Sequence, residues 1–170
     1  PVIPNDDRLA DIQQAGMQLL AANNFEQHEV SAFARNGQIS AHNMNYWQFG
    51  DYLGIGAGAH SKITLPEQGT VIRVSKTRQP DKYLARQGSL VAKNSPIATE
   101  DMAMEFMMNG LRLKGGVPAE YFPARTGLHS ASIDSQVSSL QRQGLMESGY
   151  DRYSATPLGY QFLNTLLQSF

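Results

Sequence analysis

The sequence predicts an α/β unit followed by a mainly helical domain of winged-helix type. Three observations support this prediction. Apolar residues at helical spacing lead directly into a strand-like run in the first third of the chain, glycines alternate with apolar residues over 53–59, and helices surround a short hairpin after residue 98. A helix running straight into a strand is the repeat unit of α/β barrels and doubly wound sheets.

The first element is predicted to be a helix that begins after Asn5. An asparagine side chain caps the first backbone N–H groups, and the acids at 6 and 7 suit the positive end of the helix dipole. Apolar residues recur at helical spacing until Asn23 and Asn24 end the helix. Residues 25–34 follow as a predicted strand with Phe25 and Phe33 available for burial.

A second strand is predicted over residues 53–59, where every second residue is glycine: Gly54, Gly56 and Gly58. Glycine on one face of a strand indicates close approach by backbone or ligand. The run lacks the glycine spacing and following helix of a dinucleotide-binding loop. Close packing against a helix explains the glycines equally well.

Charge divides the chain into three parts. Residues 1–65 carry a net charge of −3, residues 66–97 carry +4, and residues 98–170 carry −2. We therefore expect a first unit over 1–65, a basic connecting segment over 66–97 with a loose strand pair and a short helix, and a second domain over 98–170.

The second domain is predicted to contain three helices, a β-ribbon and a closing helix. Thr99 caps the first helix, Gly127 ends the second, and Gly144 ends the third. A hairpin is expected around Gly149, and Thr156 with proline at the next position begins the last helix. The Met-rich helix near 102–108 is expected to supply adaptable core packing rather than a metal site.

Composition excludes several classes of protein. The chain has 170 residues, 41% hydrophobic and 17% charged, with a net charge of −1, which is typical of a folded soluble domain and unfavourable for strong nucleic-acid or membrane binding. No run is long and apolar enough to span a bilayer, so we expect a cytoplasmic protein. The chain has no cysteine and therefore cannot ligate an iron–sulfur cluster by itself.

Three segments resemble a known family. Residues 29–34 read EVSAFA, residues 42–47 read HNMNYW, and residues 50–61 read GDYLGIGAGAHS. They are similar, in order and spacing, to segments of HemW-like radical-SAM proteins, relatives of the oxygen-independent coproporphyrinogen III oxidases. Residues near Leu111 and residues 155–159 resemble the C-terminal domain of the same family.

The resemblance implies that this chain is the C-terminal part of a longer protein, as its opening at Pro1 rather than Met also suggests. Residues 1–65 would be the last α/β elements of a partial (β/α) barrel, followed by a winged-helix-like domain of the HemN C-terminal type. The longer protein would hold a [4Fe–4S] cluster and S-adenosylmethionine, and would bind heme or act on a porphyrinogen. The chain alone is predicted to be inactive and free of cofactor.

His42 is the candidate heme-iron ligand that the resemblance implies. An imidazole is a good axial donor, Asn43 would orient it, and Tyr46 with Trp47 would pack near the porphyrin. The alternative is that His42 and Asn43 cap a short helix while the two aromatic residues fill a core.

The resemblance also implies a pocket for S-adenosylmethionine or substrate. Gly56, Gly58, His60 and Ser61 would border it at the carboxyl end of a barrel strand, and Ala34 would contact the cofactor through its backbone. No catalytic residue is assigned in this chain.

Two other functions stay open: a nucleic-acid-binding winged helix, and an interaction module without a ligand of its own. The expected recognition helix, 130–143, carries one arginine, one aspartate and no lysine, which disfavours phosphate contacts. We expect heme-recipient proteins as possible partners, no nucleic acid, and a homodimer formed through the exposed edge of the barrel part.

Overall fold

The computed structural model describes residues 3–170, so Pro1 and Val2 lie outside the described residues. The chain forms two compact units, one ending at Ser40 and the other comprising Ala41–Phe170. Each unit is described separately below. Within residues 3–170, no helix combines the length and apolar character needed to cross a membrane.

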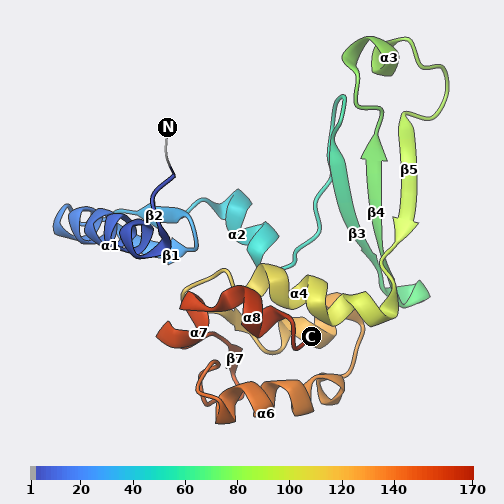
Figure 1. Cartoon of the computed structure of the whole chain (residues 1–170). Helices are drawn as coiled ribbons and strands as arrows, with labels where there is room; N and C mark the ends of the chain where they lie inside the picture. The colour runs from blue at the N-terminus through green and yellow to red at the C-terminus, as the bar shows by residue number, and fades with distance from the viewer. Residues whose placement is uncertain (1–2) are drawn as a thin grey trace. The chain divides into compact units, whose positions relative to one another are not determined.

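The first unit consists of one helix and one hairpin (Figure 1). Helix α1, Asp6–Ala22, begins as predicted, since the side chain of Asn5 accepts a hydrogen bond from Arg8 N at 3.1 Å. The predicted single strand over 25–34 is wrong. It is an antiparallel pair, β1 (Glu26–Glu29) and β2 (Ala32–Ala34), joined by a tight turn.

Glu29 makes that turn. Its carboxylate accepts hydrogen bonds from the backbone N and the hydroxyl of Ser31, at 3.0 and 3.2 Å. Such a local bond replaces the backbone pairing that a continuous strand would have. The side chain of Glu29 is buried, so these bonds also satisfy a carboxylate that has lost water.

The second unit begins with α2 (Ala41–Trp47) and a three-stranded antiparallel sheet in the order β3-β4-β5 (Figure 1). The strands are β3 (His60–Leu65), β4 (Thr70–Lys76) and β5 (Val91–Pro96). A single 3-10 turn, η1 (Pro66–Gln68), joins β3 to β4, and α3 (Pro80–Leu84) lies between β4 and β5. The sheet thus joins residues on both sides of the expected boundary at 65/66.

Residues 53–59 do not form the predicted strand. Gly56 and Gly58 have φ of 99° and 71°, outside the range of a regular strand. Only Tyr52, just before the run, pairs with β3, through a bridge to Lys62. The alternation of glycine and apolar residues therefore belongs to a loop.

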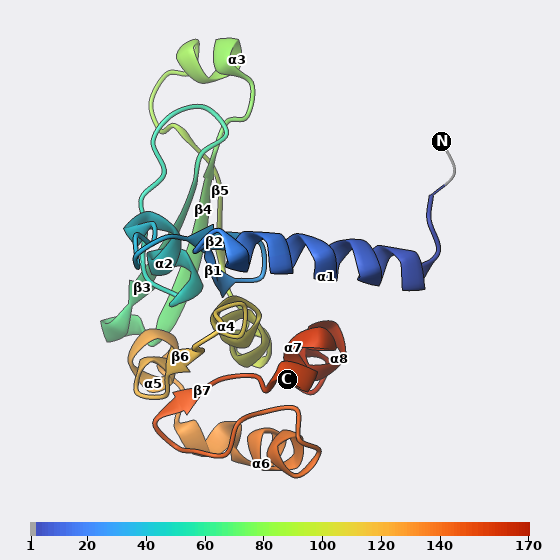
Figure 2. The ribbon, with the colours of Figure 1, turned by 90° about the vertical axis from the view of Figure 1, so that its left-hand side faces the viewer.

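The helical part comprises η2 (Thr99–Asp101), α4 (Met102–Gly110), β6 (Val117–Pro118), α5 (Tyr121–Thr126), η3 (Ser130–Ser132), α6 (Asp134–Arg142), β7 (Arg152–Tyr153), α7 (Pro157–Gln161) and α8 (Leu163–Leu167). Strands β6 and β7 pair as a two-residue ribbon. The helices follow the predicted order, but the ribbon differs from the predicted hairpin around Gly149, because its strand β6 comes before α5 and an isolated bridge joins Met146 to Ala155 (Figure 2). Thr156 caps α7 as predicted, accepting from Gly159 N at 3.0 Å.

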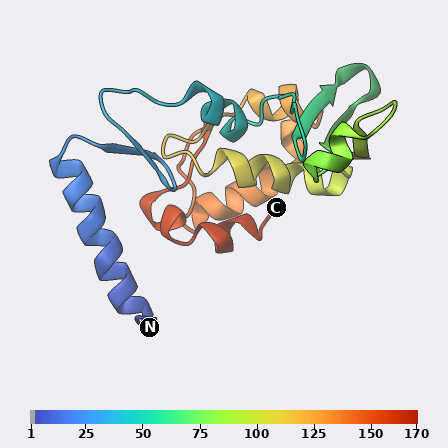
Figure 3. The ribbon, with the colours of Figure 1, turned by 90° about the horizontal axis from the view of Figure 1, so that it is seen from above.

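One core fills the second unit, and α4 runs through its centre between α2 and α8 (Figure 3). Phe106 of α4 is fully buried and meets Phe49 and Phe122 edge-on, with ring centroids 5.6 and 5.2 Å away. Met102 and Met107 are buried in the same core, which confirms the packing role predicted for this helix. The residues after α2 are thereby fixed to the helical part.

Candidate functional site

Three aromatic side chains form a row on the second unit. The His42 ring meets the Tyr46 ring edge-on at 5.0 Å, and Tyr46 lies against Tyr52 at 4.2 Å. His42 and Tyr46 share one face because they are four residues apart on α2. His42 is exposed, whereas Tyr46 and Tyr52 are half-buried. We call His42, Tyr46 and Tyr52 the aromatic row.

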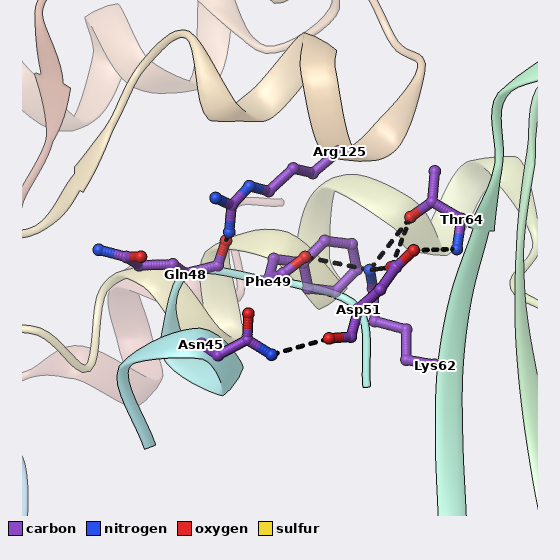
Figure 4. Close-up of polar contacts among 7 residues, drawn as sticks. All are labelled: Asn45, Gln48, Phe49, Asp51, Lys62, Thr64 and Arg125. Atoms are coloured by element: carbon purple, nitrogen blue, oxygen red, sulfur yellow. Dashed lines mark hydrogen bonds and ion pairs between the residues drawn. The ribbon is translucent and has the colours of Figure 1, made fainter. Parts of the chain in front are cut away.

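The helix that carries His42 is anchored at its C-terminal end (Figure 4). The carbonyl of Gln48 accepts a hydrogen bond from the Arg125 guanidinium of α5. The side-chain amide of Asn45 donates to the carbonyl of Asp51 at 2.8 Å, and Gly50 N donates to the carbonyl of Asn45. These bonds satisfy the terminal carbonyls of a helix too short to be stable alone.

Lys62 links this anchor to the sheet. Its side chain is 4% exposed, and its ammonium donates to the Asp51 carboxylate at 2.9 Å and to the carbonyl of Phe49 at 3.0 Å. It also lies 4.1 Å from the centroid of the Phe49 ring. Phe49 has a φ of 58°, which costs about 1 kcal/mol for a residue with a side chain. The buried ring and the lysine hold it in that conformation.

Burial shifts the pKa of both residues of the Asp51–Lys62 pair. Burial raises the pKa of Asp51, but hydrogen bonds from Thr64 N, Lys62 and the Thr64 hydroxyl outweigh it, so the pKa falls below 3.8. Burial lowers the pKa of Lys62 below 10.5, and Asp51 offsets only part of that shift. The carboxylate, with more donors and partial exposure, is the better satisfied partner.

Trp47 lies on a different face of α2 from His42 and Tyr46. The guanidinium of Arg112, next to the end of α4, is 4.5 Å from its ring centroid. The indole Nε1 is buried and has no hydrogen-bond partner among residues 3–170. Trp47 therefore packs between α2 and α4. The ring that lies against Tyr46 in the aromatic row is that of Tyr52 rather than Trp47.

The glycine-rich loop approaches β3 closely at one point. A Cβ on Gly54 would overlap the backbone carbonyl of His60, so only glycine fits. Gly54 N donates to the Ser61 hydroxyl at 2.9 Å, which buries that hydroxyl against the loop. Gly56 has open space around its Cα, and Gly58 lies near Arg78.

The residues expected at a S-adenosylmethionine pocket lie on several elements of the two units. His60 and Ser61 are consecutive on β3 and point to opposite faces of the sheet. Ala34 is buried in β2 of the first unit, whereas Gly56, Gly58, His60 and Ser61 belong to the second unit. In residues 3–170, no group of three or more His, Asp or Glu side chains is arranged to hold a metal ion.

Tyr52, Asp51, Lys62 and Arg125 were not predicted to belong to the site. Lys62 could have been identified from the sequence, because it is a charged residue within a segment that is otherwise typical of a strand. A lysine at such a position is buried only when it has a partner of opposite charge. Arg125 gave no signal, because its partner carbonyl at Gln48 is 77 residues earlier.

The fold agrees with comparisons to known proteins. Residues 97–162 match the HemN C-terminal domain. The solved structure of coproporphyrinogen III oxidase (HemN) from Escherichia coli, a radical-SAM enzyme, superposes with a TM-score of 0.65 over 98% of this chain and 41% of that chain, at 14% identity. At this identity the match establishes the fold, that of the HemN class.

Sequence relatives define the family more narrowly. The chain is 42% identical over its whole length to the heme chaperone HemW of Escherichia coli and 41% to that of Haemophilus influenzae. It is 31% identical to a mitochondrial radical S-adenosyl methionine domain-containing protein of Bos taurus over 98% of its residues. The chain belongs to the HemW-like family. It spans 44%, 44% and 40% of the lengths of these relatives.

Proposed function

We propose that the protein to which this chain belongs binds heme as cargo, with His42 as axial ligand. The observation that supports this most directly is the exposed imidazole of His42 near the N-terminal end of α2, beside the Tyr46 ring. An axial ligand needs an accessible nitrogen, and a planar porphyrin needs apolar or aromatic surface beside it. Relatives named as heme chaperones support the same assignment.

The residues of α2 have different proposed roles in heme binding. His42 donates to the iron, Asn43 orients the imidazole, and Tyr46 with Tyr52 contacts one face or edge of the ring. Trp47, held by Arg112, supports α2 from the side of the core and keeps the helix in place when cargo binds. The cargo would then be passed to heme-recipient proteins.

We place the radical-SAM cofactors mostly outside this chain. A [4Fe–4S] cluster requires thiolates, which these 170 residues cannot supply. Gly56 and Gly58 both have positive φ, and Gly56 has open space beside it, which fits a loop that a ligand approaches closely. S-adenosylmethionine is the proposed ligand. When bound to a reduced cluster it supplies radical chemistry. His60, Ser61 and Ala34 are proposed only as its neighbours in the complete protein.

The same proposal assigns an architecture to each part of the chain. Residues up to 65 would border a partial (β/α) barrel, and α1 fits such a position because it exposes Leu9, Ile12 and Leu19. The three helices α4, α5 and α6 with the β6–β7 ribbon would form a winged-helix-like module. Helix α6 carries a single basic residue, Arg142, so this module is proposed to bind protein rather than nucleic acid.

Hemin titration of the full-length protein tests the proposal. His42→Ala removes the imidazole, whereas His129→Ala removes another exposed imidazole elsewhere in the second unit. We expect His42→Ala to weaken hemin binding at least tenfold and His129→Ala to leave it unchanged. Equal affinities for all three proteins would contradict the assignment.

A further inference from the structure

A cavity of about 420 Å³ lies between the sheet and α4, and its chemistry is not used by the site described above. Its sheet wall carries His60, Arg73, Ser75 and Lys93. Its other wall is formed around Asp101 and Glu105, at the start of α4. We call this space the sheet cavity.

Strand register places these side chains on one face. His60, Ser75 and Lys93 are directly opposite one another across β3, β4 and β5, and so form one row. Lys62, Arg73 and Ser95 form a second row two residues further along. Because the side-chain period of a strand is two, both rows point to the same side of the sheet.

The second row also reaches the aromatic row. Tyr52 pairs with Lys62, so its side chain lies on the same face as Arg73, across one strand. Neighbouring strands are about 4.8 Å apart, which puts the Tyr52 and Arg73 backbones about 10 Å apart. Burial raises the pKa of Tyr52, and Tyr46 and Glu105 raise it further, whereas Arg73 lowers it. The Tyr52 hydroxyl therefore interacts with two of the charged residues that line the sheet cavity, Arg73 and Glu105.

Only some of the charged groups of the cavity form ion pairs with one another. Arg73 donates to Glu105 at 2.6 Å, which uses one face of its guanidinium. Lys93 is exposed and has no ion pair among the described residues. Asp101 opposes an anion, but the hydroxyls of Ser75 and Ser95 and the imidazole of His60 add donors on the sheet side. A carboxylate or a phosphate is the kind of group that such donors recognise, and a porphyrin such as heme carries carboxylates.

We infer that the sheet cavity binds a carboxylate side chain of the porphyrin whose iron is ligated by His42. The inference rests on the proposed function. The porphyrin lies along Tyr46 and Tyr52, and its propionate reaches Lys93, His60 and the free donors of Arg73. The aromatic row and the sheet cavity thus select a tetrapyrrole that carries acidic side chains over a neutral one.

Hemin and hemin dimethyl ester separate this role from iron ligation, since only the first carries free carboxylates. In the full-length protein, Lys93→Met and His60→Gln should each weaken hemin binding about five- to tenfold and leave the affinity for the ester unchanged. Glu105→Gln frees the guanidinium of Arg73 and should tighten hemin binding about twofold. Lys82→Met, an exposed lysine of α3, is the matched control.

The outcomes separate the two proposals. If His42→Ala weakens both ligands while Lys93→Met and His60→Gln weaken neither or both equally, heme ligation holds and the carboxylate site is refuted. If His42→Ala changes neither ligand, the proposed function itself fails. A loss of S-adenosylmethionine binding in Lys93→Met, with hemin affinity intact, would assign the cavity to that cofactor and overturn the inference.

Discussion

The ammonium of Lys62 lies 4.1 Å from the centroid of the Phe49 ring and donates to the carbonyl of the same residue. This contact joins β3 to the core through the residue that follows α2. The stability of the aromatic row therefore depends on a buried cation, and that cation depends on Asp51.

Asp51→Asn should destabilise the second unit by about 2 kcal/mol. The substitution leaves Lys62 buried without its counter-charge, and the partial exposure of Asp51 reduces the full cost of breaking a buried pair. Urea unfolding measures the change, with Glu67→Gln on the exposed η1 turn as a control expected within about 0.5 kcal/mol of wild type. The double variant Asp51→Asn/Lys62→Met should recover part of the loss; a further loss would contradict the pairing.

The Asp51 carboxylate should also determine how the stability of the second unit falls at acid pH. The pKa of Asp51 is lower in the folded state than its ordinary value of 3.8, so its contribution is complete above that value and is lost as pH falls below it. Wild type should lose stability more steeply than Asp51→Asn between about pH 4 and pH 2. The lowered pKa of Lys62 changes the pH dependence of stability only at alkaline pH, where the lysine loses its proton. Parallel acid limbs for the two proteins would exclude the hydrogen-bonded carboxylate.

Gly54→Ala tests the close approach of the loop to β3. Its methyl group would overlap the carbonyl of His60, so we expect a loss of about 1–3 kcal/mol. Gly115→Ala is the matched control, because nothing lies within 4 Å of the added atom and its backbone is not left-handed. Thermal unfolding distinguishes them. Equal melting temperatures would show that the loop does not rest on β3.

The 170-residue chain should self-associate through α1. Leu9, Ile12 and Leu19 are 44%, 53% and 67% exposed, and no residue of this helix is buried. Exposed apolar side chains on one helix face favour association. Ile12→Lys should shift the chain toward monomer in sedimentation velocity, whereas Gln13→Lys should not. A wild-type monomer at high concentration would refute the homodimer expected from the sequence.

Local signals predicted much of this fold. Asn5 and Thr156 both accept the capping bonds that their positions indicate, and Gly127 ends α5 with a φ of 75°. In each case the decisive interaction lies within four residues, so the sequence contains all the information needed. The roles of His42 and Tyr46 come from the resemblance in residues 42–47 and stay predictions.

Long-range contacts explain what the sequence could not predict. The alternation over 53–59 is typical of a strand, but the loop forms because Gly54 meets the His60 backbone and Gly56 turns with positive φ. Tyr52 joins the aromatic row through its bridge to Lys62, and Arg73 reaches Glu105 across 32 residues. Neither partner can be identified from spacing along the chain.

We propose that His42 provides the axial nitrogen for heme. The most direct measurement is the absorption spectrum of the hemin complex of full-length His42→Ala, recorded with and without added imidazole. We predict a shifted Soret band and weakened binding in the variant, and recovery of the wild-type spectrum when imidazole occupies the space left by the side chain. A wild-type Soret band in His42→Ala without imidazole would contradict ligation of the iron by His42.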